Sequence, residues 1–147
     1  MADTTYKLLR DRIFDKVNAL TRFEVVKKFP TLDFEGFPAA AVYPSDGEGD
    51  YETNVEDQRI YAFIVAVYFP IRPDSEEEAL DAVMQAQDDV LDTFTADKQL
   101  NADGAISFPA GKMLVGVRPV FTAWGATDDK KLMVAEIMIK VLISTST

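Results

Sequence analysis

Acidic residues between positions 44 and 57 have the spacing of a possible cation site. Asp46, Glu48 and Asp50 alternate with other residues as the first ligands of a calcium-binding loop do, and Asp57 stands where the twelfth ligand would be. The sixth position of such a loop needs glycine for its turn, and this chain has Tyr51 there. The flanks also have the composition of strand ends rather than helices. We therefore expect an exposed acidic loop over 44–57 without a dedicated metal site.

The residue types that perform most enzymatic chemistry are missing. The 147 residues include no histidine and no cysteine, which removes the commonest general base, thiolate metal ligands, disulfides and cysteine nucleophiles. No serine stands in a nucleophile-elbow sequence, and Gly47 and Gly49 lie among acids that would repel a phosphate. We expect no catalytic residue, no cofactor and no metal, so an enzyme is the least expected class of protein.

The charges are unevenly distributed along the chain. Lys and Arg number 15 against 25 Asp and Glu, and the net charge of −10 argues against a protein that binds DNA by neutralising phosphates. Residues 44–57 hold six acids and residues 74–97 hold nine, whereas residues 1–28 hold seven bases and four acids. Such asymmetry would orient copies head to tail, with a basic flank against an acidic flank. Chance clustering on a monomer surface explains the pattern about as well.

Apolar periodicity predicts two helices. Over Thr5–Leu20 the residues Leu9, Ile13 and Val17 recur at helical spacing. The second helix starts at a capping box, with Ser75 as the N-cap, and runs to about Thr95. Its expected buried stripe consists of Leu80, Val83, Met84, Val90, Leu91 and Phe94.

Five segments have the composition of strands. They are Phe23–Phe29, Ala39–Tyr43, Arg59–Phe69, Lys112–Trp124 and Lys130–Ile143. In the first, Phe23, Val25 and Phe29 should share one face. The third is apolar on both faces, so both faces should be covered, by this subunit or by a neighbour. The fourth contains Pro119, which predicts an edge strand or a bulge.

The aromatic residues Tyr61, Tyr68 and Trp124 could line a ligand pocket. Packing in the core is the more expected role, given the alternation around them. The longest apolar run, Ile60–Ile71, is too short for a membrane span, which needs about 20 residues. The first residues show no signal-peptide pattern, so we expect neither export nor a membrane.

The order of these elements resembles one protein family. The order begins with an amphipathic helix, a strand, the proline-bounded segment Phe37–Pro44 and a long polar loop. It continues with the long strand from Arg59, a helix that begins in acids, and a terminal hairpin ending in Leu132–Val141. This order is similar to that of the tail terminator, or tail completion, proteins of long-tailed bacteriophages. The resemblance covers nearly the whole chain and consists of element order, without a specific motif.

The resemblance implies a single α+β domain over residues 1–147. Its mostly antiparallel sheet of about five strands would carry two helices on one face, in the order α-β-β-β-α-β-β. Proteins of that family form six-membered rings on the end of the tail tube, stop its polymerisation and offer a surface to the head connector. The implied partners are further copies of the chain, the tail tube protein and the connector or neck protein. DNA would pass through the channel without specific binding, and the protein would be assembled in the host cytoplasm into the virion tail.

The relevant residues would then be interfacial. We expect these contacts at the acidic loop, at the start of the long strand and on the wetter face of the last strand. The candidates are Asp46, Glu48, Asp50, Tyr51, Glu52, Asp57, Arg59, Glu136 and Lys140. Two alternatives stay open: a head–tail connector or neck protein, and a small cytoplasmic ligand-binding α+β domain. The last predicts a closed apolar pocket near Trp124 and Tyr68.

Shortening the acidic loop tests the interfacial role. Removing several residues between Asp46 and Asp57 should leave the fold intact, since surface loops tolerate changes in length, but should abolish ring formation or binding to the tube. Circular dichroism would check the fold, and light scattering together with tube binding would check assembly. Unchanged assembly by the shortened protein would contradict the expectation.

Overall fold

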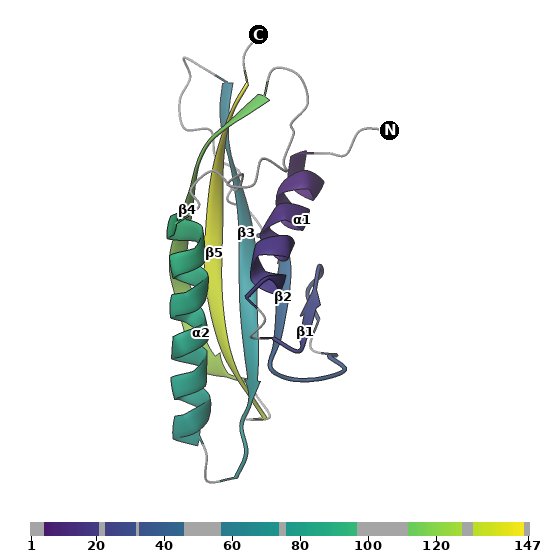
Figure 1. The fold of residues 1–147 in the computed structure, drawn as a ribbon, viewed down its shortest axis with the longest axis vertical. Helices are drawn as coiled ribbons and strands as arrows, with labels where there is room; N and C mark the ends of the chain where they lie inside the picture. Colours follow the sequence, from purple (N-terminus) through teal and green to yellow (C-terminus); the bar gives the residue numbers. More distant parts are fainter. Residues whose placement is uncertain are drawn as a thin grey trace.

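A computed structural model describes residues 5–20, 23–31, 33–45, 57–73, 76–96, 112–127 and 131–145. Seven elements follow one another along the chain (Figure 1). They are α1 (Thr5–Asn18), β1 (Val25–Lys27), β2 (Ala39–Pro44), β3 (Asp57–Pro70), α2 (Glu76–Ala96), β4 (Lys112–Ala126) and β5 (Leu132–Thr145). The predicted order α-β-β-β-α-β-β is confirmed.

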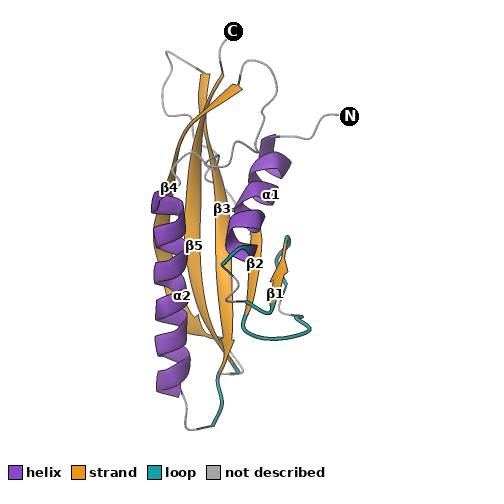
Figure 2. Cartoon of the chain, in the orientation of Figure 1, coloured by secondary structure: helices purple, strands orange, loops and turns teal. Residues whose placement is uncertain are grey.

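The five strands form one sheet in the order β1-β2-β3-β5-β4 (Figure 2). The pairing of β1 with β2 is parallel, and the other three pairings are antiparallel. β3 and β5 pair over their whole length, from Asp57 opposite Thr145 to Pro70 opposite Leu132. The sheet is therefore mostly antiparallel, as expected, and its centre is the β3–β5 ladder.

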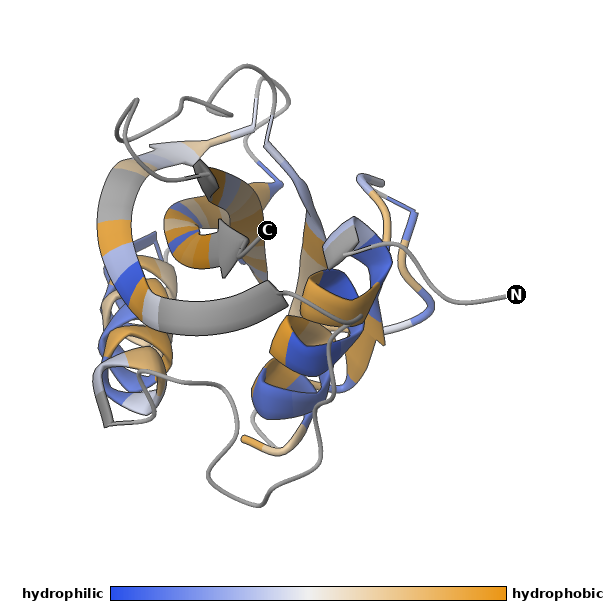
Figure 3. Ribbon diagram, turned by 90° about the horizontal axis from the view of Figure 1, so that it is seen from above, coloured by the Kyte–Doolittle hydropathy of each residue, from blue (hydrophilic) through white to orange (hydrophobic). Residues whose placement is uncertain are grey.

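Both helices pack on the same face of this sheet. α1 buries Leu9, Ile13 and Val17, and α2 buries Val83, Val90 and Phe94. These side chains join one cluster with the odd-numbered residues of β3 and β5, which are Tyr61, Phe63, Val65, Val67 and Phe69, and Ala135, Ile137, Ile139, Val141 and Ile143. Seen from above, the sheet is strongly curled, and both helices carry hydrophobic and hydrophilic bands (Figure 3). This burial of apolar surface is the main source of stability.

A second, smaller cluster lies on the other face of the sheet, which we call the outer face. The even-numbered residues of β3, Ile64, Ala66 and Tyr68, pack there with Phe34 and Phe37 from the segment before β2. The rings of Phe34 and Tyr68 lie 5.1 Å apart, and the Phe37–Pro38 peptide bond is cis. The prediction that both faces of β3 are covered is thus confirmed within one subunit.

Two details of the sequence prediction were wrong. The strand expected over Phe23–Phe29 is only three residues long, because the backbone bends at Lys28 and Phe29. Phe23 packs on the helix side and Val25 on the outer face, while Phe29 is 54% exposed, so the three do not share a face.

The buried stripe of α2 was also predicted slightly out of place. Its deepest positions include Ala79 and Ala86, whereas Leu80 and Met84 are only half-buried. The buried stripe therefore contains small side chains as well as the large ones of Val83, Val90 and Phe94. The expected N-cap, Ser75, lies outside the described residues.

β4 is an edge strand and contains irregularities between Leu114 and Gly116 and between Phe121 and Ala123. Both expectations raised by Pro119 are met, since proline cannot donate a ladder hydrogen bond and is tolerated at an edge.

Truncating Phe63 tests the role of the helix-side cluster. Phe63 is fully buried on β3, so Phe63→Ala should lower the free energy of unfolding by about 3–5 kcal/mol, through lost burial and the cavity left behind. Phe29→Ala is the matched control, because that ring is exposed, and it should change the value by about 0.5 kcal/mol or less. Urea unfolding measures both. Equal effects of the two substitutions would contradict the assigned core.

Candidate assembly surfaces

The structure describes only part of the predicted interfacial set. The residues of the acidic loop from Asp46 to Glu52 lie outside the described residues. Asp57 and Arg59 lie at the beginning of β3, where they pair with Thr145 and Ile143 of β5. Glu136 and Lys140 lie in the middle of β5, so among the described candidates these two are separated along the sheet from Asp57 and Arg59.

Glu136 and Lys140 lie on the outer face of the sheet. Glu136 is flanked by Ala66 of β3 and Ala123 of β4, and Lys140 by Ala62 and Arg118. Both side chains are half-buried, whereas the alternate residues Ala135, Ile137 and Ile139 are fully buried, so this face is the wetter one, as the sequence predicted. Its remaining neighbours on β5, Val134 and Met138, pack on the second cluster.

A pocket of about 300 Å³ opens on this face near the end of β4. Tyr68, Val134 and Glu136 line it from β3 and β5, together with Ala123, Trp124, Gly125, Ala126 and Thr127. Tyr61 and Tyr68 are buried, as expected for core residues, but Trp124 is 48% exposed, so its predicted core role was wrong. The pocket lies where the ligand-binding alternative expected one, although it is open rather than closed, because its β4 lining is exposed.

The two tyrosines of this face hold their protons tightly. Burial, reinforced by the charges of Tyr43 and Glu136, raises the pKa of Tyr68 to about 12. Burial and the Glu136 carboxylate also raise the pKa of Tyr43. A phenolate would lose hydration there and would lie close to another negative charge. At neutral pH the outer face therefore presents neutral phenols beside a carboxylate.

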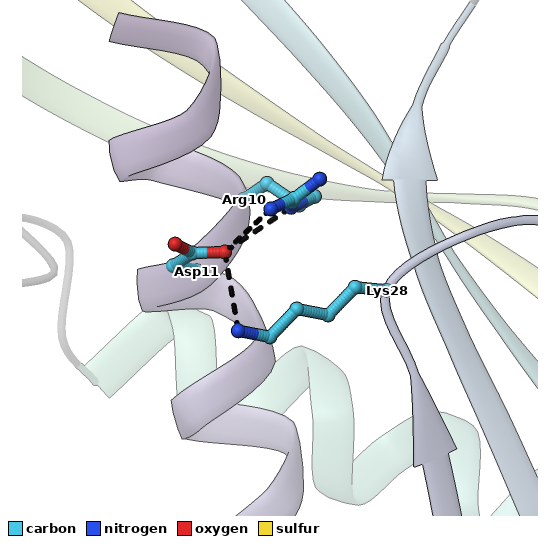
Figure 4. A network of polar contacts seen from close by, with 3 residues as sticks. All are labelled: Arg10, Asp11 and Lys28. Carbon is cyan, nitrogen blue, oxygen red and sulfur yellow. Dashed lines mark hydrogen bonds and ion pairs between the residues drawn. The ribbon is translucent and has the colours of Figure 1, made fainter. Parts of the chain in front are cut away.

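A network of charged side chains ties α1 to the end of β1 (Figure 4). The Arg10 guanidinium donates hydrogen bonds to Asp11, and the Lys28 ammonium lies 3.3 Å from the same carboxylate oxygen. Partial burial raises the pKa of Asp11, but the hydrogen bonds from Arg10 and Lys28 outweigh it, and the pKa lies below its ordinary value. Lys28 also lies 4.7 Å from the centre of the Phe14 ring.

α2 has the opposite charge. Its 21 residues include seven acids and no base. Glu77, Asp81, Asp88 and Asp92 are exposed, which confirms the predicted acidic outer face. α1 packs on β1 and β2 and α2 packs on β3, β4 and β5, so the two helices cover different halves of the sheet (Figure 1).

Neither a metal-binding cluster nor a membrane-spanning helix occurs among the described residues. No group of three or more acidic, histidine or cysteine side chains there could hold a metal ion. Among the described helices none is both long and apolar enough to cross a membrane.

Comparisons with known proteins give a fold but no family. No family model matches the sequence, and a search of curated proteins gives no match. A solved chain from the virion of a native gene transfer agent particle aligns with 97% of this chain and 99% of its own length. The sequence identity is 14% and the TM-score is 0.56, so the two share a fold. A second solved chain, 15% identical over 99% of this chain and 98% of its own, has a TM-score of 0.45, from which we conclude nothing.

The pH dependence of stability tests the burial of Tyr68. The folded-state pKa of about 12 lies above the ordinary value of 10.0, so the unfolded chain releases this proton first as the pH rises. The stabilising contribution of the neutral phenol should be complete below pH 10 and lost between about pH 10 and pH 12.

Tyr68→Phe should reduce that loss, because phenylalanine has no proton to release. Urea unfolding at several values of pH measures the effect, and absorbance of the tyrosinate band follows the titration directly. Glu136→Gln is the second variant, and it should lower the pKa of both Tyr68 and Tyr43. A Tyr68→Phe protein whose stability falls as steeply as that of the parent would contradict this assignment.

Proposed function

We propose that this chain is a structural protein of a phage-like virion, and that it acts as a tail terminator. In this function six copies close into a ring on the end of the tail tube, stop its polymerisation and provide the surface for joining to the head. The observation that carries the proposal is the shared fold with a chain of the gene transfer agent virion over almost the full length of both. The resemblance of the element order to tail terminators supports the finer assignment.

The distribution of charge is compatible with this function. A ring around a DNA channel must let the phosphates slide past, and a net charge of −10 disfavours tight binding to them. A ring also needs a heterologous interface, in which two different surfaces of the same chain meet. The described residues provide two helices of opposite net charge, α2 with seven acids and no base, and α1 with four bases and two acids.

A second candidate function rests on the pocket beside Tyr68 and Trp124. The small ligand-binding domain predicts that a compound bound there raises the melting temperature, because binding to the native state alone stabilises it. The tail terminator function predicts no ligand in this pocket. A connector or neck protein would share the ring but not the location, so immunogold labelling of virions separates a ring at the tube end from one inside the neck.

The mass in solution tests the ring. Light scattering over a wide range of concentration should show a species of six chains of 16.4 kDa, about 98 kDa in total, and negative stain should show rings. The measurement is repeated with tail tubes present, since the tube end would align the copies. A stable dimer under all conditions would argue against the ring, because a two-fold interface uses the same surface on both copies and leaves none for a third.

A further inference from the structure

The sheet ends in two lateral edges of different composition. β4 is the last strand on one side, with α2 packed beside it, and we call this the β4–α2 edge. β1 is the last strand on the other side, with α1 beside it, and we call this the α1–β1 edge (Figure 2).

Exposed apolar side chains occur on both edges. Among the described residues four large hydrophobic side chains are more than a third exposed: Tyr6, Phe29, Val120 and Trp124. Phe29 after β1 belongs to one edge, and Val120 and Trp124 on β4 belong to the other. Tyr6 belongs to neither edge, because its ring lies 4.7 Å from that of Tyr61 on the central strand β3. Apolar patches with polar surroundings are typical of surfaces that a partner covers.

The charges determine which edges can meet. α2 carries seven acids and β4 carries two bases, Lys112 and Arg118, so the β4–α2 edge has a sum of −5 and two such edges brought together would repel. The described residues between 5 and 37 carry six bases and five acids, a sum of +1. The β4–α2 edge of one copy can therefore approach the α1–β1 edge of another, whereas two β4–α2 edges repel each other. Charge thus selects the orientation, and the apolar side chains supply the area to be buried.

The backbone of β4 also disfavours a symmetric contact between two β4–α2 edges. An exposed strand edge invites pairing with the same strand of another copy. Here Pro119 lacks an N–H group, and two irregularities in register interrupt β4 on either side of it. Because a regular antiparallel ladder between two β4 strands would need an uninterrupted edge, symmetric pairing is disfavoured.

We propose that a second copy of this chain docks edge to edge, with Val120 and Trp124 of one copy against the α1–β1 edge of the next, beside Phe29. The contact is heterologous, so each copy keeps one free edge for a further copy, and repetition gives a ring when the rotation between neighbours closes, as the proposed function requires. The inference rests on the proposed ring for the number of copies and for its place in the virion.

Single cysteines test the contact, since the chain has no cysteine of its own. Phe29→Cys and Val120→Cys proteins are prepared separately and treated with a short bismaleimide, alone and mixed. The contact predicts a cross-linked dimer in the mixture, with at least a fivefold lower yield from either protein alone. The double variant should give a ladder of cross-linked species that ends at the closed ring. Arg72→Cys, at an exposed position in the turn between β3 and α2, is the control and should not cross-link with either partner.

Each outcome decides between the alternatives. Efficient cross-linking of Val120→Cys with itself would overturn the proposal in favour of a symmetric contact. Rings in negative stain without cross-links between Phe29→Cys and Val120→Cys would overturn the proposed edges but leave the terminator function standing. Specific cross-links would support the proposed edges, but if immunogold labelling of virions found no protein on the tail, the terminator function would be overturned. Absence of cross-links in a chain that stays monomeric at every concentration would also overturn the contact. Circular dichroism of each variant confirms that the fold is retained.

Discussion

The burial of β3 on both of its faces is the constraint on which the rest of the structure depends. This strand lies between β2 and β5 and is apolar at successive positions, so neither face can remain in water. The helices cover one face, and Phe34 and Phe37 cover part of the other. Towards β4 that cover gives way to half-buried side chains and the open pocket at Tyr68. The subunit therefore has a complete core but an incomplete outer face and incomplete edges.

The fold was largely predictable because alternation and helical periodicity are strong over long elements. Every residue of Ile60–Phe69 has an apolar side chain, and the face of each follows from its number alone. The short β1 was not predictable in the same way. Whether Phe23 and Val25 share a face depends on the backbone bend at Glu24 between them, which alternation in the sequence does not reveal. The buried stripe of α2 includes the small residues Ala79 and Ala86, which a search for large apolar side chains does not select.

The candidate surfaces were predictable mainly in their charges. Runs of acids in α2 can be read directly from the sequence, and the structure keeps them exposed. The exposure of Trp124 was not predictable, since its ladder partner Ala135 belongs to the helix-side cluster and the indole is nevertheless 48% exposed. The wetter face that carries Glu136 and Lys140 was predictable, because these residues alternate with the apolar residues that are buried on the helix side.

A fold shared at 14% identity leaves function to the surfaces that differ from one protein to the next. A ring protein needs two complementary edges and no reaction centre, so its working residues can be ordinary acids, bases and aromatic rings. That explains why motif searches fail here while edge composition remains informative. In the proposed ring the acidic helix would have a further role, because its seven like charges beside β4 would disfavour a symmetric dimer that competes with ring closure.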